Sequence, residues 1–190
     1  MKLNLRRTSP AQRSSASRKM MSAALVGAAV VGASVLSLSP ASALNWKCTS
    51  SSSTIDDAGY SGPFADNWDF TVKNCVARSG GYVYAKATVS WDAPPSYAGT
   101  DLTETFDSAH FRLYLKHSDA GADTVLLKKD FNIQPALAAM SSAGNGSWSS
   151  STIKKSVGSK SAYAAGALRL NWDEDGKGVR QYDFKGTRSV

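Results

Sequence analysis

The sequence predicts an all-β protein, an antiparallel β-sandwich of about eight strands stapled by one disulfide. Three observations favour this class. Apolar and polar residues alternate with a period of two in several segments, glycines and prolines separate those segments, and the chain holds a single cysteine pair. Short alternating strands joined by turns are typical of sandwiches and barrels, so a small β-barrel is the alternative architecture.

Alternation is clearest in Tyr82–Trp91 and in His110–His117. Valines, alanines and Trp91 share one face of the first segment, and Phe111 shares a face of the second with two leucines. Such alternation marks strands that bury one face and expose the other. Similar patterns and strand-forming residue types predict the remaining strands: Asn45–Ser50, Trp68–Val72, Val125–Ile133, Trp148–Lys155, Ala162–Trp172 and Val179–Phe184.

Turn residues separate these strands. Ser79-Gly80-Gly81 is expected to join a strand that holds Cys75 to the Tyr82 strand as a tight hairpin, because glycine tolerates positive φ. Ser118–Asp123 joins the next pair. The Asp173–Gly178 segment contains an Asp-Gly pair between two strand-like segments, which predicts a third hairpin. A weak calcium contact is the alternative for this acidic loop, although its glycine comes too early for an EF-hand and no distal Glu follows.

Three further connections lack a sustained period. Asp92–Ser108 contains a proline pair and is predicted to be a loop of a length that is often functional. Pro135–Gly146 opens with proline at a suitable first helical position, so one or two helical turns are expected there. Ser50–Ser61 is polar and rich in turn residues, which predicts an exposed excursion between the two cysteines.

The N-terminus has the organisation of a secretory signal peptide. Residues 1–19 are basic, Met20–Ser39 is uncharged and apolar, and an Ala41-x-Ala43 site follows. We therefore expect residues 1–43 to be cleaved and residues 44–190 to form one secreted, extracellular domain. A retained membrane anchor is the alternative. The arginine pair at Arg6 leaves both the general and the twin-arginine export routes open.

Export changes the charge of the protein. The leader takes six of the 22 basic residues and none of the 15 acidic ones, so the mature chain carries a formal net charge of +1 rather than +7. A nearly neutral domain lacks a global field that attracts polyanions. We therefore expect neither nucleic acid nor a membrane as a partner of the mature protein.

Cys48 and Cys75 are expected to form the one disulfide, because exported proteins with two cysteines usually bridge them. Their separation of 27 residues is short for a bridge between the two sheets of an immunoglobulin-like sandwich. The spacing also lacks the CxxC pairs or histidine partners of a zinc site, so no metal is expected.

No reaction centre stands out. His110 and His117 are seven residues apart, which puts them on opposite faces of a regular strand. The two glutamates, Glu104 and Glu174, are expected in a loop and a turn, and no phosphate-binding glycine loop is present. We therefore predict a non-enzymatic protein without a cofactor. A small secreted enzyme whose site is assembled from scattered residues is the second alternative.

The candidate binding residues are aromatic and cationic side chains on the outward faces of two strands: Tyr82, Tyr84 and Lys86 on one, and Arg112 and Tyr114 on the other, with His110 and Lys116 beside them. If the strands are neighbours, these side chains form one continuous patch. Tyrosine and arginine are enriched where proteins meet partners. A solvated outer face without a binding role is the alternative.

The leader, the single cysteine pair and the Ala/Ser/Thr/Gly-rich strands resemble those of small exported proteins of Gram-positive soil bacteria, including protease inhibitors and adaptors of secreted toxin assemblies. The single bridge differs from the two that small subtilisin inhibitors usually have. The resemblance implies a secreted, non-catalytic interaction protein: an adaptor, an inhibitor or a toxin-complex component. Its partner is expected to be another secreted or cell-surface protein. A carbohydrate-binding module that binds polysaccharide is the alternative, although Trp68 and Trp91 are predicted on core faces.

Overall fold

The structure, a computed structural model, describes residues 44–57, 60–95, 105–139, 144–173 and 175–190. The expected signal peptide, 1–43, and most of the expected loop Asp92–Ser108 lie outside these ranges. No helix in the described ranges is long and apolar enough to cross a bilayer.

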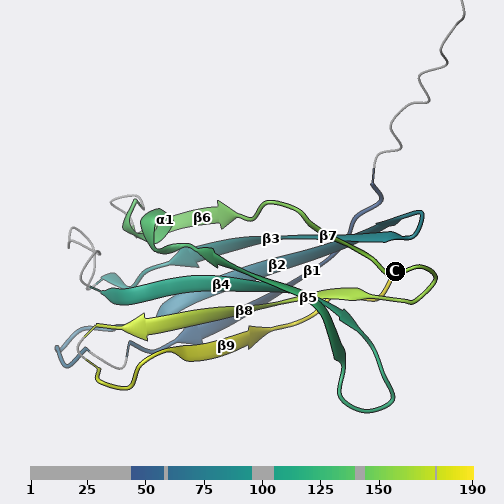
Figure 1. The fold of residues 1–190 in the computed structure, drawn as a ribbon. Coiled ribbons are helices and arrows are strands. Elements are labelled where there is room, and N and C mark those ends of the chain that lie inside the picture. Colours follow the sequence, from purple (N-terminus) through teal and green to yellow (C-terminus); the bar gives the residue numbers. More distant parts are fainter. Residues whose placement is uncertain (1–43, 58–59, 96–104, 140–143, 174) are drawn as a thin grey trace, which may run out of the picture. The chain divides into compact units, whose positions relative to one another are not determined.

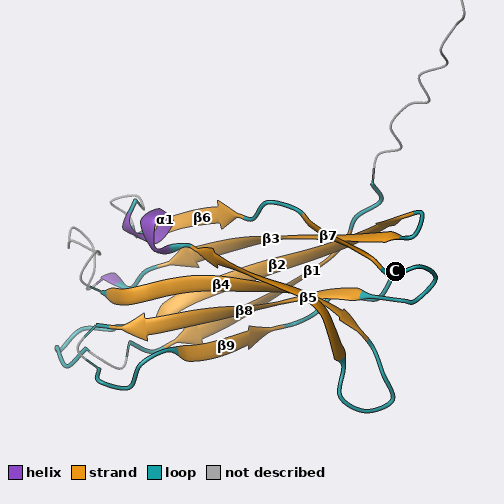
Figure 2. Cartoon of the chain, viewed as in Figure 1, coloured by secondary structure: helices purple, strands orange, loops and turns teal. Residues whose placement is uncertain are grey.

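The described residues form a sandwich of two antiparallel sheets, which confirms the predicted class (Figures 1 and 2). The first, called the β3 sheet, has the order β1-β2-β3-β6 with β7 also paired to β3; the second, called the β4 sheet, has the order β5-β4-β8-β9. The elements are β1 Lys47–Ile55, β2 Trp68–Ser79, β3 Tyr82–Asp92, β4 Phe106–His117, β5 Thr124–Asn132, α1 Gln134–Ala138, β6 Asn145–Ser149, β7 Ile153–Ser156, β8 Tyr163–Trp172 and β9 Arg180–Phe184.

The core lies between the inward faces of the two sheets, where the alternation of the sequence places the apolar side chains. Trp68 and Trp91 are both buried, as predicted. Trp68 lies 5.3 Å from Phe106 and 6.4 Å from Trp172 between ring centroids, so one end of the core is an aromatic cluster contributed by three strands. The lack of a side chain at Gly166 on β8 permits close packing, because a Cβ atom there would come within 2.3 Å of the ring of Phe111 on the neighbouring β4 and 2.8 Å of Asn74 Oδ1 on β2 of the other sheet.

The expected strand Trp148–Lys155 is split into β6 and β7. Trp148 pairs with Val89, and Ile153 pairs with Ala85. Between these two pairs, the β6–β7 segment therefore contains one residue more than β3 does. The extra residue has the effect of a β-bulge: it keeps Trp148 and Ile153 on the same, inward face, although their sequence separation is odd. Periodicity predicted the strand here and missed the interruption.

The prediction of an exposed excursion over Ser50–Ser61 is wrong for its first half. The serine run continues as strand β1 to Ile55, paired with β2 along its whole length. Ser52 and Thr71 share a hydrogen bond of 2.7 Å across this pair, and Thr54 donates to Asp69 at 2.5 Å. Serine is a poor strand former, so the pairing with β2 overrides local propensity.

The disulfide forms between Cys48 and Cys75, as predicted. The two residues are direct cross-strand partners in β1 and β2, so the bridge lies within the β3 sheet and does not join the two sheets. It fixes the start of β1, an edge strand of the described sheet, to β2.

The predicted turns are confirmed where they are described. Gly80 has a φ of 55° in the two-residue turn between β2 and β3, and residues 118–123 join β4 to β5. The acidic loop joins β8 and β9, which are antiparallel neighbours. Within it Asp175 accepts a hydrogen bond from the Lys177 amide at 2.8 Å and pairs with Arg180 at 3.3 Å, so this carboxylate shapes the turn. Helix α1 has Pro135 in its first turn, as expected.

The C-terminal segment 185–190 lies beside the first residues of β8. The Thr187 amide donates to Ala164 O at 2.8 Å. Arg78, on β2 of the other sheet, donates to Val190 O at 3.0 Å and to Gly158 O at 2.8 Å. Arg78 therefore connects the two sheets at one open side of the sandwich and holds the segment in place.

Candidate interaction surface

The structure separates the five predicted binding residues into two groups. Strand β3, which carries Tyr82, Tyr84 and Lys86, belongs to one sheet, and β4, which carries Arg112 and Tyr114, belongs to the other. Side chains on the outward faces of two stacked sheets point in opposite directions, so the expected continuous patch is wrong. The alternation placed each residue on the correct face of its own strand, but it could not show which strands are neighbours.

The group on the β3 sheet forms an aromatic and basic surface. Tyr82 is 47% exposed, and the Lys154 ammonium lies 5.8 Å from its ring centroid. The Lys86 ammonium lies 4.4 Å from the ring centroid of Trp46, just before β1. Cation–π contacts of this kind hold the rings in place at a surface.

The group on the β4 sheet lies at a concave surface. Tyr114 borders two hollows, of about 540 Å³ and about 410 Å³, and Val125 borders both as well. Leu126 lines the larger hollow, and Ala165 lines the smaller one. We call these two joined hollows the Tyr114 surface. A hollow lined by an aromatic ring, aliphatic side chains and a few polar groups is typical of a binding site.

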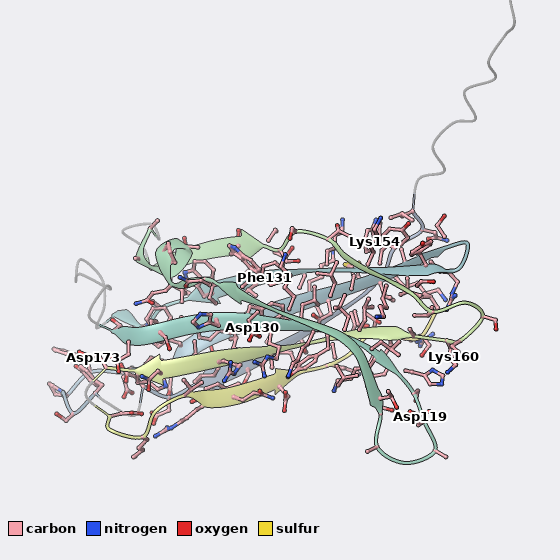
Figure 3. The ribbon with its side chains drawn as sticks, in the orientation of Figure 1. Asp119, Asp130, Phe131, Lys154, Lys160 and Asp173 are labelled. Carbon is pink, nitrogen blue, oxygen red and sulfur yellow. A yellow bond between two sulfur atoms is a disulfide. The ribbon has the colours of Figure 1, made fainter. Side chains whose placement is uncertain are left out.

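Local features of β4, β5 and β8 produce this concavity. The pairing of β4 with β5 shifts register between Leu115 and Lys116, which introduces an irregularity of the β-bulge kind. Such irregularities increase the local bend of a strand pair. Figure 1 shows the β4–β5 hairpin extending away from the rest of its sheet, with Asp119 near its tip in Figure 3. Ala165 and Gly166 on β8 add little bulk beside Tyr114.

A charged cluster borders the Tyr114 surface. Arg112 donates two hydrogen bonds to Asp130, from Nε at 2.5 Å and from Nη2 at 2.6 Å, and Arg169 Nη1 lies 3.6 Å from the same carboxylate. Asp130 lies on the exposed face of β5, and its label is near the centre of the view in Figure 3. The bonded Arg112 guanidinium lowers the pKa of Asp130 below its ordinary value, and this bond raises the pKa of Arg112. The bidentate pair fixes Arg112 beside the hollow.

Replacing Asp130 by asparagine is expected to lower the free energy of unfolding by about 0.5–1 kcal/mol at pH 7. The effect is small because the Asp130 side chain is 38% exposed and solvent screens the pair. The pKa of this carboxyl is depressed by folding, so its contribution is complete above the unfolded value near 3.8 and disappears as pH falls through the lower folded value. Urea unfolding of both proteins between pH 7 and pH 2 measures this. A difference that stays constant with pH would contradict the assignment.

His117 is the last residue of β4, and His110 lies inside the strand, paired with Asn132 on β5 and Arg169 on β8. The His117 ring Nδ1 is 2.6 Å from Ser161 O, and its Nε2 is 3.5 Å from Asp119 Oδ1. Tyr163, on β8, donates a hydrogen bond to Asp123 in the β4–β5 turn; partial burial and this bond raise the pKa of Tyr163 to about 12. These contacts tie the hairpin to β8. In the residues that the structure describes, no three His, Cys, Asp or Glu side chains are grouped to hold a metal ion.

Sequence reasoning missed the apolar half of the Tyr114 surface. Val125 is 46% exposed, and Leu126 is partly buried at the free edge of β5. The sequence shows both as ordinary strand residues. Their position just after the predicted turn Ser118–Asp123 places them near the end of β4. The sequence does not show the register shift between β4 and β5 that makes this surface concave.

Comparison with protein-family models, with curated proteins and with solved structures finds no match to this chain. The fold and the surfaces define an all-β sandwich with one disulfide within a sheet and a concave outer face. Its function is therefore inferred from these surfaces alone.

Proposed function

We propose that this chain is a secreted, non-catalytic protein-interaction protein that binds another secreted or cell-surface protein through the Tyr114 surface. The observation that carries the proposal is the pair of hollows that meet at Tyr114 and Val125 on the outer face of the β4 sheet. Export is inferred from the N-terminal signal pattern, and the disulfide is compatible with it.

The lining of the Tyr114 surface supports a protein partner. Partly exposed aromatic and aliphatic side chains at the centre of a surface, with charges around them, have the composition of a protein-binding site. Lys128 borders the larger hollow and Lys116 borders the smaller one. The partner is therefore expected to insert an apolar side chain beside Tyr114 and to place a carboxylate next to it, within reach of one of these lysines.

The pre-set geometry also supports binding. The Arg112–Asp130 pair and the contacts that tie the β4–β5 hairpin to β8 hold the walls of the hollows before a partner arrives. A surface that is already ordered loses less conformational entropy on binding.

The test is capture of a partner from the culture fluid of the source organism on the immobilised mature chain. We expect one protein to be captured in stoichiometric amount by the wild type. The double variant Tyr114→Ser/Val125→Ser is expected to capture at least about tenfold less, since each tenfold corresponds to about 1.4 kcal/mol and two central side chains are removed.

The matched control is Tyr82→Ser/Tyr84→Ser, which makes the same kind of change on the outer face of the other sheet. This control is expected to capture the partner as the wild type does, and both variants are expected to keep melting temperatures close to the wild type. Loss of the partner by the Tyr82 control with retention by the Tyr114 variant would contradict the proposal. So would the absence of any stoichiometric protein partner.

A further inference from the structure

The charges of this nearly neutral domain are divided between the two ends of the sandwich. One end, where β1 ends and β2 begins, carries Asp56, Asp57, Asp66, Asp69, Asp92, Asp107, Asp173 and Asp175 against Lys177 and Arg180. The other end carries Lys47, Arg78, Lys86, Lys154, Lys155, Lys160, Lys185 and Arg188. The acidic residues near it are Asp119 and Asp123 in the projecting hairpin and Asp183 on β9. Figure 3 shows Asp173 at one end and Lys154 and Lys160 toward the other.

A hollow of about 730 Å³ lies on the basic half of the sandwich, between β1 and the C-terminal segment. Its lining contains Lys47, Lys185 and Arg188 and no acidic side chain. Thr49 and Thr187 also line it. We call this the basic hollow. Lysine and arginine side chains that lie close together, with no carboxylate among them, produce a local positive potential. This potential attracts anions even when the net charge of the protein is near zero.

The walls of the basic hollow are fixed by hydrogen bonds. The buried Asn74 amide donates from Nδ2 to Lys185 O at 3.1 Å, and the Lys185 amide donates to Ser51 Oγ at 3.0 Å. Thr187 is buried, and its hydroxyl accepts a hydrogen bond from the Ala164 amide at 3.0 Å. The lysine and arginine side chains are exposed at their positions. The backbone is therefore ordered while the cationic groups remain accessible.

We infer that the basic hollow binds an acidic polysaccharide, a sugar chain that carries carboxylate or sulfate groups. A volume of about 730 Å³ is far larger than a single ion requires and lies within the range of ligand pockets. The lining offers cations for the acidic groups, and hydroxyls for the sugar hydroxyls. It has no large apolar side chain to receive the residues of a peptide.

The test measures binding of the mature chain to four polymers at physiological ionic strength. Polygalacturonate carries carboxylates on sugars, dextran sulfate carries sulfates on sugars, polyglutamate carries carboxylates without sugars, and dextran is uncharged. Wild-type protein is expected to bind one or both acidic glycans at least about tenfold more tightly than polyglutamate and dextran. The glycan that binds identifies which acidic group is recognised.

Two triple variants separate the hollow from net charge. Lys47→Gln/Lys185→Gln/Arg188→Gln is expected to bind the glycan at least about tenfold more weakly. Lys73→Gln/Lys129→Gln/Lys177→Gln removes the same charge at residues that line none of the hollows described above, and it is expected to bind within about twofold of the wild type. Equal losses in both variants, equal binding of polyglutamate, or no binding of either acidic glycan would overturn the inference. The Tyr114→Ser/Val125→Ser variant should still bind glycan. The proposal of a glycan site and the proposal of a protein-binding surface are therefore tested separately.

Discussion

Replacing Trp68 by alanine is expected to lower the free energy of unfolding by about 3–5 kcal/mol, the usual cost of removing a large aromatic side chain from a core. Trp68 is fully buried and packs on Phe70, Phe106 and Trp172, with ring centroids 5.9, 5.3 and 6.4 Å away. These rings come from both sheets, so the cavity would lie where the two layers are held together. Since domains of this size are stable by about 5–15 kcal/mol, this loss is a large share of the total stability.

Urea unfolding followed by circular dichroism measures the effect, and Trp46→Ala is the matched control. Trp46 is only half-buried and its described ring contact is with Lys86, which is worth about 0.5–1 kcal/mol at an exposed site. The control should therefore remain close to the wild type. Equal losses in the two variants would show that the aromatic cluster is not the centre of the core.

Removing the disulfide is expected to cost about 3–4 kcal/mol, because a bridge across a loop of this length restricts the unfolded chain. The variant is Cys48→Ser/Cys75→Ser, which changes both members of a bridge with a separation of 27 residues. In the folded state the same change releases the start of β1, which among the described strands pairs with β2 alone. We expect the amides of β1 to exchange with solvent faster than those of β3, which lies inside the sheet.

The measurement combines urea unfolding with hydrogen exchange resolved by segment, and reduced wild-type protein serves as a second form without the bridge. Both forms should lose stability by a similar amount and should retain the pairing of β2 with β3. Unchanged stability in both would contradict the role of the bridge. Faster exchange of β3 than of β1 would contradict the order of the strands.

The fold was predictable because alternation reports burial directly. Val83 and Val89 are fully buried on β3, while Tyr82, which is on the same strand but points to its other face, is exposed. The serine run of β1 was not predictable, because its strand conformation depends on hydrogen bonds to β2 and not on its own residue types. The break between β6 and β7 was missed for a related reason, since a bulge changes which face a residue occupies without changing the composition.

The candidate site was predictable only in part. The sequence identified Tyr114 and Arg112 as outward-facing residues, and the structure places both at a concave surface. The sequence analysis predicted one patch that also contained Tyr82 and Tyr84, which lie on the opposite sheet. This error arose because strand order depends on long-range pairing, which a period of two does not encode. The basic hollow was missed because Lys47 and Arg188 lie at opposite ends of the mature sequence and meet only in the fold.

The net charge of +1 expected for residues 44–190 does not show how the charges are distributed in space. A formal value near zero predicts weak long-range attraction to polyanions, and this expectation concerns the molecule as a whole. The structure divides the charges between the two ends, so a local site such as the basic hollow can bind anions that the net charge does not attract.

The most direct test of the proposed function is site-specific photo-crosslinking, in which a photoreactive phenylalanine analogue replaces Tyr114 in one protein and Tyr82 in another. Each is incubated with the culture fluid of the source organism and irradiated. The proposal predicts one major protein adduct from position 114 and none from position 82. An adduct from position 82 alone, or no protein adduct from position 114, would contradict it.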